Sequence, residues 1–166
     1  MVSSSQVLAK AEVDRLTFQE FYAAESKRVF NSAFAFCGNR DAAAEATQEA
    51  FARAFARWRR LSQQEWAGAW VTTTALNVLR RGFRDATRSA PQAAELEVSD
   101  PSQRIDLLTA LRALPPRQRQ AAVLYYIVDL PVAVVAENMH LSEGAVKWHL
   151  SRARDNLRLQ LEERHA

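Results

Sequence analysis

Cysteine and histidine are scarce in this 166-residue chain, which has one cysteine, Cys37, and three histidines. A single cysteine excludes an intramolecular disulfide and a zinc site built from cysteines. His140, His149 and His165 form with it no nucleophile–base pair and no metal cluster at a useful spacing, and the sequence has no glycine-rich phosphate loop. We therefore expect no catalytic residue, no metal and no other cofactor, and the chain is not predicted to be an enzyme.

Long apolar runs are also missing. No stretch approaches the roughly 20 residues that span a bilayer, and the N-terminal segment MVSSSQVLAK has no hydrophobic signal core, so we expect a cytoplasmic protein. Only 4 glycines and 5 prolines occur, whereas alanine, leucine, arginine and glutamate are frequent, which favours an all-α fold. The formal net charge of +3 fits nucleic-acid binding without proving it.

A break in the helical pattern divides the chain in two. Residues 90–103 hold two prolines and three acidic residues but no basic one, which is typical of a solvated linker. We expect two small helical domains, 1–89 and 104–166, each with more basic than acidic side chains. An acidic linker would be repelled by DNA, so the two domains would contact DNA separately; alternatively, the segment is simply a flexible acidic loop.

The first domain shows several amphipathic helical patterns. An apolar stripe covers residues 17–37, Gly38 and Asn39 end that helix, and Asp41 is predicted to cap the next one, over residues 42–60. In that second helix Phe51, Phe55 and Trp58 share one face and are predicted to be core. The charged residues Glu45, Glu49, Arg53 and Arg60 lie on another side, which faces either solvent or a partner.

The helix predicted over residues 68–84 has one apolar face and one of mixed chemistry. The second face is predicted to be exposed and consists of Trp70, Thr73, Thr74, Asn77, Arg80, Arg81 and Arg84. Arginines hold phosphates and an aromatic ring stacks on an unpaired base, so this face suits single-stranded nucleic acid. The alternative is that Trp70 caps the core and the arginines are solvated.

Residues 114–158 have the pattern of a DNA-binding helix-turn-helix. Two apolar helical stretches and a short turn precede a helix that Ser142 opens, and Val146, Leu150, Ala153 and Leu157 share one face of it. Its basic residues are left to point elsewhere: Lys147, Arg152, Arg154 and Arg158. A basic second helix of this kind enters the major groove.

Motifs in both domains together resemble one family. Residues 17–84 are similar to the second conserved region of bacterial sigma factors, through D-A-x-x-E-x-x-Q-E-x-F from Asp41 to Phe51 and A-W…N-x-x-R-R from Ala69 to Arg81. Residues 104–160 are similar to the fourth region, through L-P-P-R-Q-R from Leu114 and S-x-G-x-V-K…L-x-R-A-R from Ser142. Two regions without a third domain resemble the extracytoplasmic-function (group IV) sigma factors.

The resemblance implies a sigma factor that binds core RNA polymerase and directs it to promoter DNA, which it helps to melt. It implies that core polymerase docks on Asp41, Glu45, Gln48, Glu49 and Arg53. It places the melted promoter strand on Trp70, Thr73, Asn77, Arg80, Arg81 and Arg84, and on the loop 61–67. It places duplex promoter DNA on Arg119, Ser142, Glu143, Lys147, Trp148, His149 and Arg152. Many such proteins are held inactive by an anti-sigma factor, which is an expected partner here.

Some positions depart from the family. Trp148 and His149 stand where the family often has Ser or Thr followed by Arg, and Trp148 either contacts a thymine methyl or sugar or packs sideways against the first helix of the motif. His140 replaces the usual turn glycine and is expected to adopt a left-handed backbone. The competing interpretations are a helix-turn-helix regulator of the quorum-sensing or response-regulator type and a helical adaptor. Residues 1–90 show no strand pattern for the former, and the basic recognition helix argues against the latter.

Overall fold

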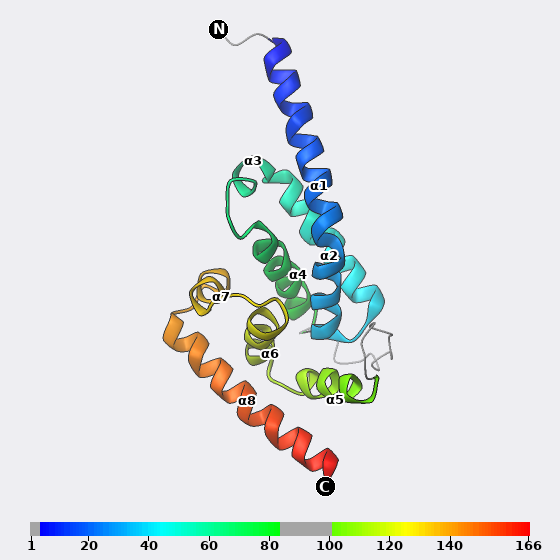
Figure 1. The fold of residues 1–166 in the computed structure, drawn as a ribbon, viewed down its shortest axis with the longest axis vertical. Coiled ribbons are helices and arrows are strands. Elements are labelled where there is room, and N and C mark those ends of the chain that lie inside the picture. The colour runs from blue at the N-terminus through cyan, green and yellow to red at the C-terminus, as the bar shows by residue number, and fades with distance from the viewer. Residues whose placement is uncertain (1–3, 84–100) are drawn as a thin grey trace.

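A computed structural model describes residues 4–83 and 101–166, with side chains described for residues 17–82, 106–164 and 166. All of the regular structure in these residues is helical, with no strand, which confirms the all-α prediction (Figure 1). Across the described residues, no helix has the length and apolar character needed to cross a membrane.

Four helices form the first module: α1 (Ser4–Cys37), α2 (Arg40–Ala56), α3 (Trp58–Leu61) and α4 (Ala67–Phe83). α2 and α4 both pack against α1 and against each other. Their shared core holds Phe34, Phe51, Trp58, Val71 and Leu76, all buried. Burying such side chains contributes roughly 1.5–3 kcal/mol each, so the apolar stripes recognised in the sequence are what hold this module together.

The start of α2 differs from the prediction. Asn39, rather than Asp41, is the N-cap: its backbone is extended, and its side-chain oxygen accepts a hydrogen bond from the Ala42 backbone N–H at 3.0 Å. Asp41 lies inside the first turn, where a carboxylate is favourable beside the helix dipole. Just before the cap, Gly38 has a positive φ of 68° and ends α1 in the left-handed conformation that glycine adopts at little cost.

The helix predicted over residues 42–60 is two helices. α2 ends at Ala56, Arg57 leaves the helical conformation, and α3 begins at Trp58. Phe51 and Trp58 are buried as predicted, but Phe55 is 52% exposed, so the prediction that it is core was wrong. Phe55 lies at the edge of an aromatic cluster, with its ring 5.0 Å from that of Phe18.

The second module consists of α5 (Pro101–Arg112), α6 (Pro116–Ala122), the π-helical turn η1 (Val123–Ile127), α7 (Val132–Met139) and α8 (Glu143–His165). α8 packs against α5, α6 and α7. Val146, Leu150 and Ala153 are buried and Leu157 is partly buried, which confirms the predicted apolar face of α8. Because α5 starts at Pro101, the second module begins within the predicted linker 90–103, most of which lies outside the described residues.

The turn between α7 and α8 has the predicted backbone. His140 adopts the left-handed conformation, with φ 54° and ψ 44°. Ser142 caps α8 by accepting a hydrogen bond from the Ala145 N–H at 3.1 Å. These two residues set the direction in which α8 leaves the turn, and so they position the recognition helix.

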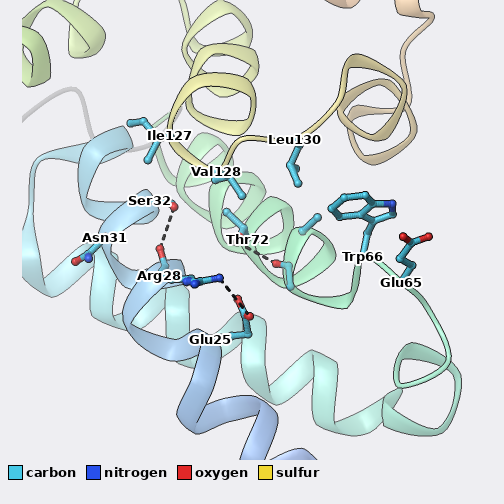
Figure 2. Close-up of a pocket in the computed structure, with 12 residues that line it drawn as sticks. Glu25, Arg28, Asn31, Ser32, Glu65, Trp66, Thr72, Ile127, Val128 and Leu130 are labelled. Carbon is cyan, nitrogen blue, oxygen red and sulfur yellow. Dashed lines mark hydrogen bonds and ion pairs between the residues drawn. The ribbon is translucent and has the colours of Figure 1, made fainter.

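The two modules pack against each other, which the expectation of separately acting domains did not foresee. α5 and η1 contact α1, and α7 contacts α4 (Figure 1). One hydrophobic core runs through both modules and includes Leu76 from the first and Leu124 from the second. Figure 2 shows Val128 and Leu130 of the second module facing Thr72 and Trp66 of the first across a pocket of about 480 Å³.

Candidate nucleic-acid interface

The exposed side of α8 presents the residues predicted to contact duplex DNA. Trp148 is 53% exposed, and the alternative that it packs sideways against the first helix of the motif is therefore wrong. Its neighbours lie on its own helix: the Arg152 guanidinium carbon is 5.6 Å from its ring centroid, and the His149 ring is 5.0 Å away. Lys147, Glu143 and Ser142 are exposed on the same N-terminal half of the helix.

His149 is the half-buried member of this group. Burial lowers the pKa of His149, and the positive charge of Arg117 lowers it further. Its Nδ1 is buried and has no hydrogen-bond partner within the described residues. The ring is therefore neutral at neutral pH, and it can offer one N–H donor rather than a full positive charge to DNA.

Arg119 is buried, although the resemblance placed it on duplex DNA. It is 8% exposed, and its guanidinium donates to the Arg112 carbonyl at 2.6 Å and the Leu114 carbonyl at 2.9 Å. It also donates to the Phe36 carbonyl of the first module at 3.0 Å. Burial lowers the pKa of Arg119, but a guanidinium stays charged at neutral pH. In this conformation, DNA cannot reach it.

The mixed face of α4 is largely covered, contrary to the prediction that it is exposed. Thr73 is 4% exposed, Thr74 is also buried, and Trp70 and Asn77 are partly buried. This face is covered by tertiary packing, because α7 lies over this side of α4. Further along the helix Arg80 is partly buried and Arg81 is exposed, while Arg84 lies outside the described residues.

Between α4 and α7 lies a cavity of about 440 Å³. Trp70, Thr73 and Asn77 line it from α4, and Glu137 and His140 line it from the second module. The structure thus brings Trp70, Thr73 and Asn77 together, as the strand-binding prediction requires, but places them against protein. Asn77 accepts a hydrogen bond from the Gln120 side chain at 2.9 Å.

The charged side of α2 is open to solvent. Asp41, Glu45, Gln48 and Glu49 are exposed, and Arg53 is partly exposed and forms an ion pair with Glu49 one turn earlier. An exposed pair at this spacing contributes only about 0.3–0.5 kcal/mol. This face therefore contributes little to the fold, so its residues are available to a partner.

Two features were missed in the sequence. Trp66 is exposed at the start of α4 and lines both inter-module pockets, although an aromatic residue in the loop before that helix was a visible signal. An apolar groove of about 690 Å³ also runs between α5, η1 and α8, where Leu107, Tyr126 and Ile127 are exposed. No local pattern predicts that groove, because it forms only when three separate elements meet.

Comparison with known families assigns both modules. Residues 21–89 match sigma-70 region 2, and residues 104–157 match sigma-70, region 4. The chain belongs to the sigma-70 family. Having regions 2 and 4 in this order, it is an extracytoplasmic-function sigma factor, and it acts by directing RNA polymerase to promoters rather than as an enzyme. The interpretation as a quorum-sensing or response-regulator protein is not favoured.

Individual relatives of this sigma factor are distant in sequence. It is 26% identical over 164 residues to the RNA polymerase sigma-E factor of Streptomyces avermitilis, a match covering 95% of this chain and 90% of the relative. It is 29% identical over 144 residues to the ECF RNA polymerase sigma factor BldN of Streptomyces coelicolor, a match that covers 78% of this chain but only 54% of that longer protein.

The fold is similar to that of the sigma factor RpoE from Bartonella quintana, solved in complex with the anti-sigma factor NepR. The TM-score is 0.75 at 21% sequence identity, covering 88% of this chain and 97% of that one. CnrH, solved in complex with the cytosolic domain of CnrY, gives a TM-score of 0.67 at 22% identity, covering 90% of each chain.

Proposed function

We propose that this sigma factor divides its work between its two modules. Residues 1–89 bind core RNA polymerase through α2 and hold the melted promoter strand on α4, and residues 104–166 bind the distal promoter element as duplex through α8. The observation that carries this division is that the exposed basic and aromatic side of α8 and the exposed charged side of α2 are chemically distinct and lie on different modules.

In this proposal, the docking surface for core polymerase consists of Asp41, Glu45, Gln48, Glu49 and Arg53. Its acidic side chains are exposed, so they can pair with basic groups of a partner without rearrangement. Glu45→Lys should weaken binding to core polymerase about tenfold, because it turns an attraction into a repulsion. A competition assay against a labelled sigma factor measures this affinity.

The matched control for this experiment is Glu163→Lys, which makes the same charge change at an exposed position on α8. It should leave the affinity for core polymerase unchanged. Equal loss in both variants would show that net charge, rather than the α2 face, governs the interaction. No loss in either would remove α2 from the docking surface.

We propose three kinds of contact with the melted strand on α4 and the loop before it. Trp66 and Trp70 offer flat surfaces to unpaired bases, and Arg80, Arg81 and Arg84 hold the phosphates of the strand. Thr73 and Asn77 supply hydrogen-bonding groups between them. Unpairing a base costs a few kcal/mol, and contacts of this kind with the freed strand offset that cost.

An anti-sigma factor is a proposed partner, and the cytoplasm is the proposed location. One structural relative was solved with an anti-sigma factor, and the groove containing Leu107, Tyr126 and Ile127 would fit the apolar face of a helix from such a protein. If the product of the neighbouring gene neither binds this chain nor suppresses the transcription that this chain directs, this partner assignment fails. If that product binds but Leu107→Asp does not weaken the complex, the groove is not its docking site.

A further inference from the structure

A cluster of exposed arginines surrounds the start of α3. Arg57, Arg59 and Arg60 are all exposed, and none of them forms an ion pair with a carboxylate of the described residues. The segment 57–66 contains one acidic residue, Glu65, against these three basic ones. Like charges this close repel one another unless a partner of opposite charge lies between them. The cluster is therefore suited to an anionic partner.

The three arginines lie on two sides of the turn. Arg57 and Arg60 are one turn apart, with the Arg60 N–H donating to the Arg57 carbonyl at 3.0 Å, so their side chains share one side. Arg59 lies on the other side by helical spacing. Trp58 and Leu61 are buried between the two sides and fix α3 on the first module. Arg57 and Arg60 are thus presented together from a turn that the core holds in place.

Arg57 lies against the aromatic residues at the start of α4. Its guanidinium carbon is 5.8 Å from the Trp70 ring centroid. The Trp70 N–H donates to the Trp66 carbonyl at 3.0 Å, so the two tryptophans are also one turn apart on one side of their helix. Trp66 is exposed. Cations beside flat rings are the combination that binds single-stranded nucleic acid, since the cations hold phosphates and the rings stack on bases.

The arginines already assigned to the melted strand lie far from these tryptophans. Arg80 follows Trp70 on α4 by ten residues, which is about 15 Å along the axis at 1.5 Å per residue. Arg80 can hold a phosphate further along the strand, but not one beside a base that stacks on Trp66 or Trp70. Arg57 and Arg60 supply cations at the tryptophan end of the helix.

The second module leaves these arginines accessible. Trp70 lines the cavity between α4 and α7, whereas neither Arg57 nor Arg60 lines it, and both are exposed. Figure 1 shows α3 far from α5 and from the C-terminal end of α8. A phosphate can therefore reach both arginines in the arrangement that the structure shows.

We propose that Arg57 and Arg60 form a phosphate-binding site for the melted promoter strand, placed so that the bases of the strand meet Trp66 and Trp70. The strand-binding surface of this sigma factor then extends from α4 across the loop onto α3, with Arg59 outside it. The proposal rests on the strand-binding role given to α4 above, and it adds cations where that role has only rings. Each neutralised phosphate releases counterions, so the site makes the affinity for single-stranded DNA more sensitive to salt.

The test compares arginines that differ in position but not in charge. Arg57→Gln and Arg60→Gln each remove one proposed phosphate contact. Arg59→Gln is the control for Arg60, with the same change on the other side of the same turn. Arg40→Gln is the control for Arg57, because the Arg40 guanidinium also lies over a ring, 5.9 Å from the Phe30 centroid, at the opposite end of α2. Circular dichroism verifies that all four variants fold.

The readout is the affinity of the full-length chain for a labelled single-stranded DNA oligonucleotide of mixed sequence, measured by fluorescence anisotropy between about 0.05 and 0.2 M salt. Arg57→Gln and Arg60→Gln should each reduce the slope of log affinity against log salt by about 0.7 and weaken binding about fivefold at 0.1 M salt. Arg59→Gln and Arg40→Gln should leave the slope unchanged. Contacts of α8 with the oligonucleotide are the same in all variants and cancel from the comparison.

Equal reductions in all four variants would overturn the proposal, because net charge rather than position would then govern binding. An unchanged slope in both Arg57→Gln and Arg60→Gln would overturn it too. So would the absence of measurable binding by the wild-type chain, since both arginines are exposed and need no other protein.

Transcription separates this result from the proposed function. Core-dependent transcripts together with an unchanged slope would remove only this site and leave the proposed function intact. If the wild-type chain gives no core-dependent transcripts, the assigned roles fail. The salt dependence, which needs no polymerase, then still decides whether the two arginines bind a DNA strand.

Discussion

In the proposed function, Trp148 is the residue on which duplex recognition by α8 would depend most. Trp148 is more than half exposed beside Lys147 and Arg152. Exposing an apolar ring to water is unfavourable, and the exposed ring adds nothing to the core. A flat apolar ring in the major groove can contact a thymine methyl, while its basic neighbours reach phosphates or base edges. We therefore propose that the exposed Trp148 contacts DNA.

Trp148→Ala should weaken binding of the sigma factor–polymerase complex to duplex promoter DNA about tenfold, or about 1.4 kcal/mol. The free energy of unfolding should change by no more than about 0.5 kcal/mol, because the side chain is exposed. Leu159→Ala removes another exposed apolar side chain from α8, beyond the helix-turn-helix, and should leave DNA affinity unchanged. An equal effect of both substitutions would contradict a specific role for Trp148.

With Asp129, His140 is one of two non-glycine residues with a positive φ among the described residues. Its left-handed conformation costs a residue with a side chain roughly 1–2 kcal/mol. His140→Gly removes this strain. The greater freedom of glycine in the unfolded chain lowers the free energy of unfolding by roughly 0.5–1 kcal/mol, which offsets part of the gain. The substitution should therefore raise the melting temperature by about 3 °C, the shift that about 1 kcal/mol produces in a chain of this size.

The control for His140→Gly is Ala133→Gly, at an exposed position inside the neighbouring helix α7. There the backbone is helical but in the first turn of α7, so glycine should lower stability by up to about 1 kcal/mol. Thermal unfolding followed by circular dichroism measures both. A decrease in melting temperature for His140→Gly would show that the histidine side chain stabilises the turn by more than its backbone costs.

At the scale of a helix, the start of α2 provides a direct comparison between two candidate caps. Asn39→Ala should cost about 1 kcal/mol, because it leaves the Ala42 N–H without its side-chain acceptor. Asp41→Ala removes a favourable interaction with the helix dipole and should cost less, about 0.3–1 kcal/mol. Urea unfolding of both variants gives the two free energies, and a larger loss for Asp41→Ala would restore it as the cap.

Helix positions followed well from the sequence because each depends on local periodicity. The spacing of Val146, Leu150 and Ala153 was enough to identify the buried face of α8, and Ser142 was correctly identified as its cap. The errors concern helix boundaries at which two neighbouring positions differ little in free energy. Asn39 and Asp41 are both good caps, and no glycine or proline marks the end of α2 at Ala56.

At the scale of the whole molecule, the packing between the modules could not be predicted from the sequence. The mixed face of α4 has the composition of an exposed nucleic-acid surface, and it is covered only because α7 of a distant segment packs against it. Arg119 matches the family pattern for a DNA contact, and its burial depends on the position of the Phe36 carbonyl, 83 residues earlier in the chain. Both differences result from the packing of the two modules against each other.

The proposed division of roles assigns a different requirement to each module. A module that docks on polymerase and holds single-stranded DNA needs a charged face, which α2 exposes, and a stacking face, which on α4 is largely covered by the second module. A module that binds duplex DNA needs one exposed helix on a rigid base, and α8 has a buried face on one side and a cap at Ser142.

Run-off transcription tests the central claim most directly. The purified chain is combined with sigma-free core RNA polymerase on a pool of genomic fragments, and the 5′ ends of the transcripts are sequenced. The account predicts discrete start sites that depend on the chain and share two upstream sequence motifs, one for each module. An absence of such starts, with the chain alone still binding duplex DNA, would contradict it and would indicate an ordinary helix-turn-helix regulator.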